Sequence, residues 1–104
     1  MESIFWKGYS NLERHSAINI LQDVISKFGD VVDFKLFSDI SISMTIEIVE
    51  KKLDGLFEEL SRFILLEEVS RLNSVSNQER TLYLNVTFVK STGNMIVEVP
   101  SVPG

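Results

Sequence analysis

Cysteine is absent from this 104-residue chain, and histidine and tryptophan occur once each. Without cysteine there can be no disulfide, no thiolate nucleophile and no cysteine metal ligand. The absence also fits a reducing compartment, so we expect a cytoplasmic protein. The first residues, MESIFWKGYS, show no basic segment followed by an apolar run, and so predict no secretion signal. No stretch approaches the ~20 apolar residues of a membrane helix, so we expect no membrane partner.

Basic residues are also scarce. Lys and Arg number 10 against 15 Asp and Glu, which gives a net charge of −5, and no basic run occurs. Binding to nucleic-acid phosphates needs clustered basic side chains, so we expect no nucleic-acid partner. The length suits one hydrophobic core, and we predict a single domain over residues 1–104.

A helix is predicted between Ser10 and Gly29. Ser10 and Glu13 have the spacing of a capping box, and Gly29 has the position of a left-handed C-terminal cap. Apolar residues recur between them at helical spacing, which indicates one buried stripe. The stripe consists of Ala17, Ile18, Leu21, Val24, Ile25 and Phe28.

The period changes to two after Gly29, which indicates strands. Val32, Phe34 and Leu36 alternate with charged residues and are predicted to face the core. A second run alternates more regularly, with Ile40, Ile42, Met44, Ile46 and Ile48 on its apolar side. Ser38-Asp39 between the runs predicts a tight hairpin turn.

A second helix is predicted from Lys51 to about Phe63, with an apolar stripe that includes Leu53, Leu56 and Leu60. The stripe breaks after Ile64, so residues 64–72 form either a short strand, which we favour, or a new helical turn. The run TLYLNVTFV predicts a strand with Leu82, Leu84, Val86 and Phe88 buried. Residues 90–104 are expected to form a C-terminal hairpin and tail.

With SIFWKG as the first strand, the order of elements is βαββαβ followed by a hairpin. This order predicts an α+β fold of the ferredoxin-like split βαβ type, an antiparallel sheet with two helices on one face. The order, Gly8 at the first strand-to-helix corner, and the run ISMTIEIVEKKLDGLFEELSRF together resemble the small ACT-like regulatory modules. The resemblance covers residues 3–72.

ACT-like modules bind amino acids or similar small effectors near this corner, between paired domains. The resemblance therefore implies a ligand site at Gly8, Tyr9, Ser10 and Asn11, with an amino acid or similar small effector as ligand and no further cofactor. The N–H groups at the start of the helix would suit an anionic group such as a carboxylate.

The lone His15 lies away from the apolar stripe of its helix, so we interpret it as a surface or interface residue. A catalytic acid or base, or a metal ligand, is the alternative. No constellation of nucleophile, base and carboxylate emerges from the sequence. We therefore assign no catalytic residue and no metal site.

The face of the sheet away from the helices is expected to carry aromatic and small hydroxyl side chains. Phe5, Phe37, Tyr83 and Asn85 are the interface candidates on this face. Such a face suits an interface core, although strand propensity alone could also account for it. We favour self-association as a homodimer or larger assembly.

The leading hypothesis is a non-enzymatic module that binds a small ligand or regulates a partner, and that acts as a homo-oligomer. The first alternative is an enzyme of the dimeric α+β barrel type, with His15 or Tyr83 in a cavity that takes a small hydrophobic substrate. The second alternative is a pure protein-interaction domain that adds an edge strand or the PSVPG tail to a partner's sheet.

Overall fold

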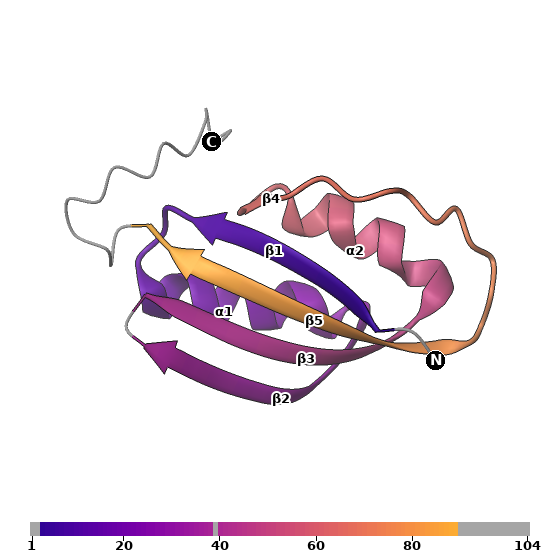
Figure 1. Ribbon diagram of the computed structural model, residues 1–104, viewed down its shortest axis with the longest axis horizontal. Coiled ribbons are helices and arrows are strands. Elements are labelled where there is room, and N and C mark those ends of the chain that lie inside the picture. The colour runs from indigo at the N-terminus through magenta and orange to yellow at the C-terminus, as the bar shows by residue number, and fades with distance from the viewer. Residues whose placement is uncertain (1–2, 39, 90–104) are drawn as a thin grey trace.

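A computed structural model describes residues 3–38 and 40–89 of the chain (Figure 1). Within these residues it is an α+β structure, a five-stranded mixed sheet with two α-helices. The elements are β1 (Ile4–Ser10), α1 (Arg14–Ser26), β2 (Gly29–Ser38), β3 (Ser41–Val49), the 3-10 turn η1 (Glu50–Lys52), α2 (Leu53–Leu60), β4 (Leu65–Leu66) and β5 (Glu79–Phe88).

The strands lie in the order β2-β3-β5-β1-β4. β5 pairs antiparallel with β3 but parallel with β1, from Ile4 opposite Leu82 to Ser10 opposite Phe88. The expectation of a fully antiparallel sheet is therefore wrong. The reason is the irregular segment 67–78, which carries the chain from β4 back to the end of the sheet where β1 begins. The α+β class is confirmed, but this strand order does not confirm the split βαβ arrangement.

Both helices pack on one face of the sheet, and the core lies between them (Figure 1). Trp6 is 5% exposed, and its ring meets that of Phe57 edge-on, with centroids 5.2 Å apart. The helix stripes and the buried side of β5 are confirmed. The buried hydrophobic residues are Trp6, Ala17, Leu21, Val24, Ile25, Ile42, Met44, Ile46, Ile48, Leu53, Leu56, Leu60, Ile64, Leu66, Leu82, Leu84, Val86 and Phe88.

The start of α1 differs from the expected capping box. Glu13 is the N-cap, and its carboxylate accepts a hydrogen bond from Ser16 N at 3.2 Å. Ser10 is instead the last residue of β1, because its pairing with Phe88 keeps the backbone extended up to that point. Its buried hydroxyl accepts a hydrogen bond from Leu12 N.

The other end of α1 also differs from the expectation. Lys27 is the C-cap, in a right-handed helical conformation. Gly29 begins β2 and pairs with Ile48, so it does not form the left-handed cap. What requires glycine there is space: a Cβ would lie 2.5 Å from the carbonyl oxygen of Glu47.

β2 is less buried than its alternating sequence predicts. Its register with β3 shifts between Val31 and Asp33, which leaves Val32 without a partner and 51% exposed. Val31 and Phe34 pack against the core in its place. Leu36 pairs with Ile42 but is 54% exposed on this edge strand. The bulge, which a simple period of two cannot predict, is the physical reason.

The ambiguous segment 64–72 begins as the short strand that we favoured. Leu65 pairs with Tyr9 and Leu66 with Gly8, both antiparallel, and the strand ends there. β2 and β3 form the predicted hairpin, with Ser38 opposite Ser41. Asp39 of the predicted turn, and the predicted C-terminal hairpin and tail at 90–104, lie outside the described residues.

Replacing Gly29 with alanine tests the close approach of β2 and β3. We expect Gly29→Ala to lower the free energy of unfolding by about 1–3 kcal/mol, because the new methyl group would press on backbone. Urea denaturation measures this loss. Gly55→Ala in α2 is the matched control.

At Gly55 a Cβ would meet only the side chain of Phe28, at 3.1 Å. Alanine also favours the helix by about 1 kcal/mol relative to glycine, so we expect a change below about 1 kcal/mol. Equal losses in the two variants would contradict the backbone clash at Gly29.

Candidate functional site

The face of the sheet opposite the helices, called the outer face below, carries its side chains in level rows. The pairing of the strands puts Lys7 beside Asn85, Asn85 beside Ser43, and Ser43 beside Lys35. One step along the strands, Phe5 lies beside Tyr83 and Tyr83 beside Thr45. The outer face therefore places side chains from four strands in register.

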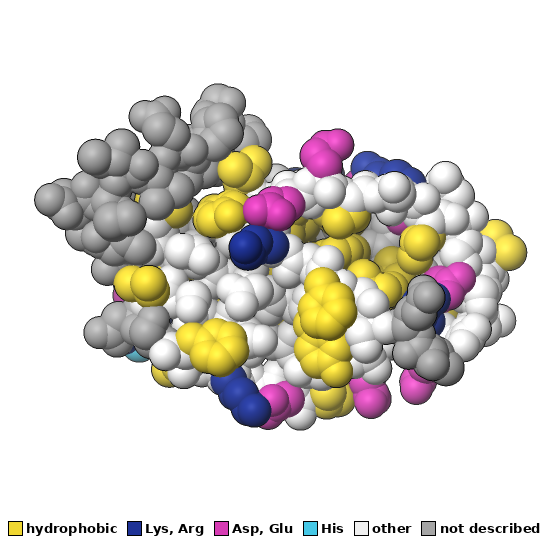
Figure 2. Space-filling model, in the orientation of Figure 1, with side chains coloured by type: hydrophobic (Ala, Val, Ile, Leu, Met, Phe, Trp, Pro, Cys, Tyr) yellow, Lys and Arg dark blue, Asp and Glu magenta, His cyan; other side chains and the backbone are white. Residues whose placement is uncertain are grey.

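Aromatic rings stand on this face. Phe5 is 70% exposed and stacks on Tyr83, with centroids 5.1 Å apart and planes 18° from parallel. Phe37 on β2 is 63% exposed. Figure 2 shows separate groups of hydrophobic side chains on the face, with mostly uncharged surface and a few charged side chains among them. The exposed ring of Phe5 gains little from burial within one copy of the chain, and exposed aromatic groups of this kind are typical of contact surfaces.

A groove of about 490 Å³ crosses the outer face. It contains all four interface candidates from the sequence and reaches the acidic residues just after β4. Its lining residues are Phe5, Trp6, Lys7, Phe37, Ser43, Glu67, Glu68, Val69, Tyr83, Leu84 and Asn85. Because these residues come from both edges of the sheet and from its central strand, the groove spans the whole width of the face.

Charged groups stand toward the two edges of the outer face. At the β4 edge the hydroxyl of Tyr9 donates to Glu67 Oε2 at 3.1 Å, and this bond to a carboxylate raises the pKa of Tyr9. At the β2 edge Lys35 lies 3.9 Å from Asp33, and both side chains are more than half exposed. An exposed pair at this distance contributes little, so Lys35 is available to another partner.

A second, smaller cleft of about 90 Å³ lies between the start of β1, α2 and residues 69–72. Trp6, Leu53 and Phe57 form its apolar wall, and Asp54 and Arg71 stand among its polar lining residues. It shares Phe5, Trp6 and Val69 with the outer groove. The two hollows are therefore neighbours around the edge of β1.

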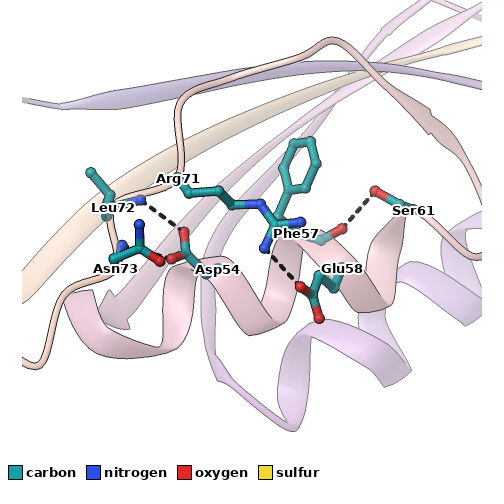
Figure 3. Close-up of polar contacts among 7 residues, drawn as sticks. All are labelled: Asp54, Phe57, Glu58, Ser61, Arg71, Leu72 and Asn73. Atoms are coloured by element: carbon teal, nitrogen blue, oxygen red, sulfur yellow. Dashed lines mark hydrogen bonds and ion pairs between the residues drawn. The ribbon is translucent and has the colours of Figure 1, made fainter.

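Residues 67–78 are called the strap below. Residues 69–72 of the strap form the outer wall of this cleft, and carboxylates of α2 hold the strap (Figure 3). Asp54 accepts hydrogen bonds from the backbone N–H groups of Leu72, at 3.0 Å, and Asn73, at 2.8 Å. Arg71 donates to Glu58 at 2.7 Å and lies 5.9 Å from the ring centroid of Phe57. Asn73 has a φ of 48°, a conformation that asparagine adopts more readily than most residues.

Glu50, at the start of η1, holds the far end of the strap. Its carboxylate accepts hydrogen bonds from the hydroxyl of Ser74 and from the guanidinium of Arg80. These two bonds, with the charge of Arg80, lower the pKa of Glu50 below its usual value of 4.5. The backbone N–H of Glu50 also donates to Gln78 O at 2.8 Å.

The corner implied as a ligand site, Gly8 to Asn11, lines neither hollow. A Cβ on Gly8 would lie 3.1 Å from side-chain atoms of Ile64 and of Leu66, so the missing side chain makes room for β4. Ser10 is buried and bonded to Leu12 N, Tyr9 is bonded to Glu67, and Asn11 is exposed. A ligand site at these four residues remains a prediction.

His15 is exposed on α1, on the helical side of the sheet, as the sequence indicated. Among residues 3–38 and 40–89, no three His, Asp or Glu side chains come together in a group that could hold a metal ion. Sequence reasoning found the aromatic residues of the outer face but missed the strap and the alignment of Lys35 with Lys7. Both depend on the pairing of β5, which joins distant parts of the chain.

Lowering the pH should release the stabilisation that Glu50 provides. Because its pKa is lowered in the folded protein, its contribution is present above about pH 4.5 and is lost as the pH falls through the lowered value. We therefore expect Glu50→Gln to be less stable than the wild type at pH 7, with the difference shrinking below about pH 4.5. Urea denaturation at a series of pH values measures it.

Asp23→Asn, at an exposed position on α1, is the control for the loss of a carboxylate. A difference between wild type and Glu50→Gln that stays constant from pH 7 to about pH 3 would show that the charge of Glu50 does not hold the strap.

Comparisons with protein-family models, curated proteins and solved structures found no match to the chain. The similarity to ACT-like modules therefore stays a prediction from the order of elements. Within the described part of the chain, neither helix has the length and apolar character needed to cross a membrane.

Proposed function

We propose that this chain is a non-enzymatic module that acts as a homo-oligomer, with the outer face of the sheet as the contact surface. The observation that carries the proposal is the stack of the exposed Phe5 on the half-buried Tyr83, which faces Phe37 across the groove. Interfaces are enriched in aromatic residues at their centre and carry charged residues at the rim.

The floor of the groove supports this assignment. Between the aromatic groups lie Ser43 and Asn85, which are half-buried and uncharged. Covering such side chains costs less solvation free energy than covering charged ones, and they can hydrogen-bond across a contact. The exposed apolar area of Phe5 and Phe37 would be removed from water at the same time, which favours association.

The size of the face suggests a reversible contact. Five strands spaced about 4.8 Å apart, over about three side-chain rows, offer roughly 500 Å² on each copy. This is below the ~800 Å² per partner of a standard stable interface. We therefore expect a dimer that dissociates at micromolar concentrations.

The fold itself supports a ferredoxin-like ancestry for the module. Without β5, the remaining strands would stand in the order β2-β3-β1-β4. This order, with a helix after β1 and another after β3, is that of the split βαβ arrangement. We infer that β5 is a strand inserted into such a sheet.

Binding of a small effector is a second candidate function, and the volume of the outer groove favours it. About 490 Å³ lies within the ~300–1,000 Å³ of small-molecule pockets. Calorimetric titration with a panel of amino acids tests it, and heat from one of them that Asn85→Ala abolishes would support it. The alternative of a dimeric α+β barrel enzyme would have Tyr83 in the groove but His15 on the helical side, so we favour a role without catalysis.

Removing the exposed aromatic side chains tests self-association. We expect the wild type to show a concentration-dependent mass between monomer and dimer in sedimentation equilibrium. Phe5→Ser and Tyr83→Ser should shift it to the monomer by weakening the dimer about tenfold or more, because each removes a central aromatic contact.

Val75→Ser is the matched control, because Val75 is 89% exposed on the strap, away from the groove. It should leave the mass unchanged, and circular dichroism should show that all three variants are folded. A wild type that stays monomeric at about 1 mM, or a dimer that both aromatic variants preserve, would refute the proposal.

A further inference from the structure

We propose that two copies of the chain meet about a two-fold axis that runs along the strands, so that Lys35 of each copy faces Glu67 of the other. This inference rests on the self-association proposed above. It adds the orientation of the partner, two residues that determine pairing, and a dependence of assembly on salt.

One row of side chains across the sheet carries the charges that orient the two copies. Glu67 lies level with Lys7, because its N–H donates to Lys7 O at 2.8 Å. The row continues through Asn85 on the central strand and Ser43 on β3 to Lys35 on β2. It therefore has a negative charge at the β4 edge and a positive charge at the β2 edge, with an uncharged amide at its middle.

A two-fold axis along the strands reverses the order of the strands and keeps each row at its own level. β2 of one copy then stacks over β4 of the other, which brings Lys35 opposite Glu67 twice in the dimer. Asn85, on the central strand, lies opposite Asn85 of the other copy. An amide carries both donors and an acceptor, so this pair can hydrogen-bond to itself.

A two-fold axis across the strands, at the level of this row, places each strand over its own copy. Lys35 would then face Lys35, Lys7 would face Lys7, and Glu67 would face Glu67. Like charges brought together in an interface repel and oppose association, so this orientation is disfavoured. The charges therefore select the axis along the strands.

The apolar side chains fit the same orientation. Tyr83 on the central strand meets Tyr83 of the second copy, as an aromatic pair on the axis. Phe37 on β2 comes over the β4 edge, where Leu65 is half-exposed. Asp33 of one copy and Glu68 of the other also come near these same two edges, and the two contacts of Lys35 with Glu67 have to outweigh the repulsion between them.

Exchanging the two charges between copies provides a specific test. Lys35→Glu alone would place two carboxylates together at each cross-contact, and Glu67→Lys alone would place two ammonium groups together there. We expect each variant by itself to dimerise about tenfold or more weakly than the wild type. In an equimolar mixture the heterodimer has two cross-contacts. One joins the wild-type Lys35 and Glu67, and the other joins the two substituted residues, whose charges are opposite again but exchanged in position.

The charges at positions 35 and 67 favour the heterodimer over both homodimers. One copy carries carboxylates at both positions 35 and 67, and the other carries ammonium groups at both, so each cross-contact joins a carboxylate to an ammonium group. A heterodimer should therefore form with near wild-type affinity. Native mass spectrometry distinguishes it from both homodimers.

Lys52→Glu and Asp23→Lys are the matched controls, with the same changes of charge on the helical side. They should dimerise like the wild type. The wild-type dimer should weaken as sodium chloride rises from about 50 mM to about 500 mM, because salt screens charges at the rim of an interface.

The outcomes separate this inference from the proposal on which it rests. A wild-type chain that never dimerises would refute the proposed self-association itself. A wild-type dimer that both single variants preserve, or a mixture that forms no heterodimer, would overturn the axis along the strands and leave the outer face as the contact surface. Weakening by the helical-side controls to the same degree would show an effect of net charge and would also overturn the pairing of Lys35 with Glu67.

Discussion

The pairing of β5 between β3 and β1 is the interaction on which the rest of the structure depends. It buries Leu82, Leu84 and Val86 in the middle of the core and pairs along the whole of β1 and β3. On the opposite side of the same strand, Tyr83 and Asn85 enter the centre of the outer face. One strand therefore fixes both the core and the surface that we assign to self-association.

The position of β5 also requires the strap. A strand parallel to β1 must begin at the same end of the sheet, so the chain has to return from β4 over residues 67–78 without sheet pairing. The carboxylates of Glu50, Asp54 and Glu58, spaced four residues apart along η1 and α2, hold this return through Ser74, Arg71 and backbone N–H groups. From Ser70 onward the strap thus follows α2, whereas Glu67, Glu68 and Val69 stand at the edge of the outer groove and leave the rest of the outer face open.

Much of the fold could be predicted from the sequence because residues that are buried on one face of a helix or strand recur at a regular spacing along the chain. The apolar stripe of α1, the alternation that turns Trp6 inward in β1, and the apolar side of β5 all show such a spacing. The parallel pairing of β5, the bulge at Val32 and the N-cap at Glu13 do not, because each is set by a neighbour that is distant in the sequence or by the length of a strand pairing. The aromatic residues of the candidate site were predicted individually, but their rows depend on a register between strands that no local pattern encodes.

The most direct test of the outer face as the self-association surface follows the backbone amides of the unmodified chain by NMR while its concentration rises. Fast exchange between monomer and dimer moves the signals of residues at the contact. We predict that the signals of Phe5, Lys7, Tyr83 and Asn85 shift together with concentration while those of α1 stay fixed. Shifts confined to α1 and α2, or no shift up to about 1 mM, would contradict the account.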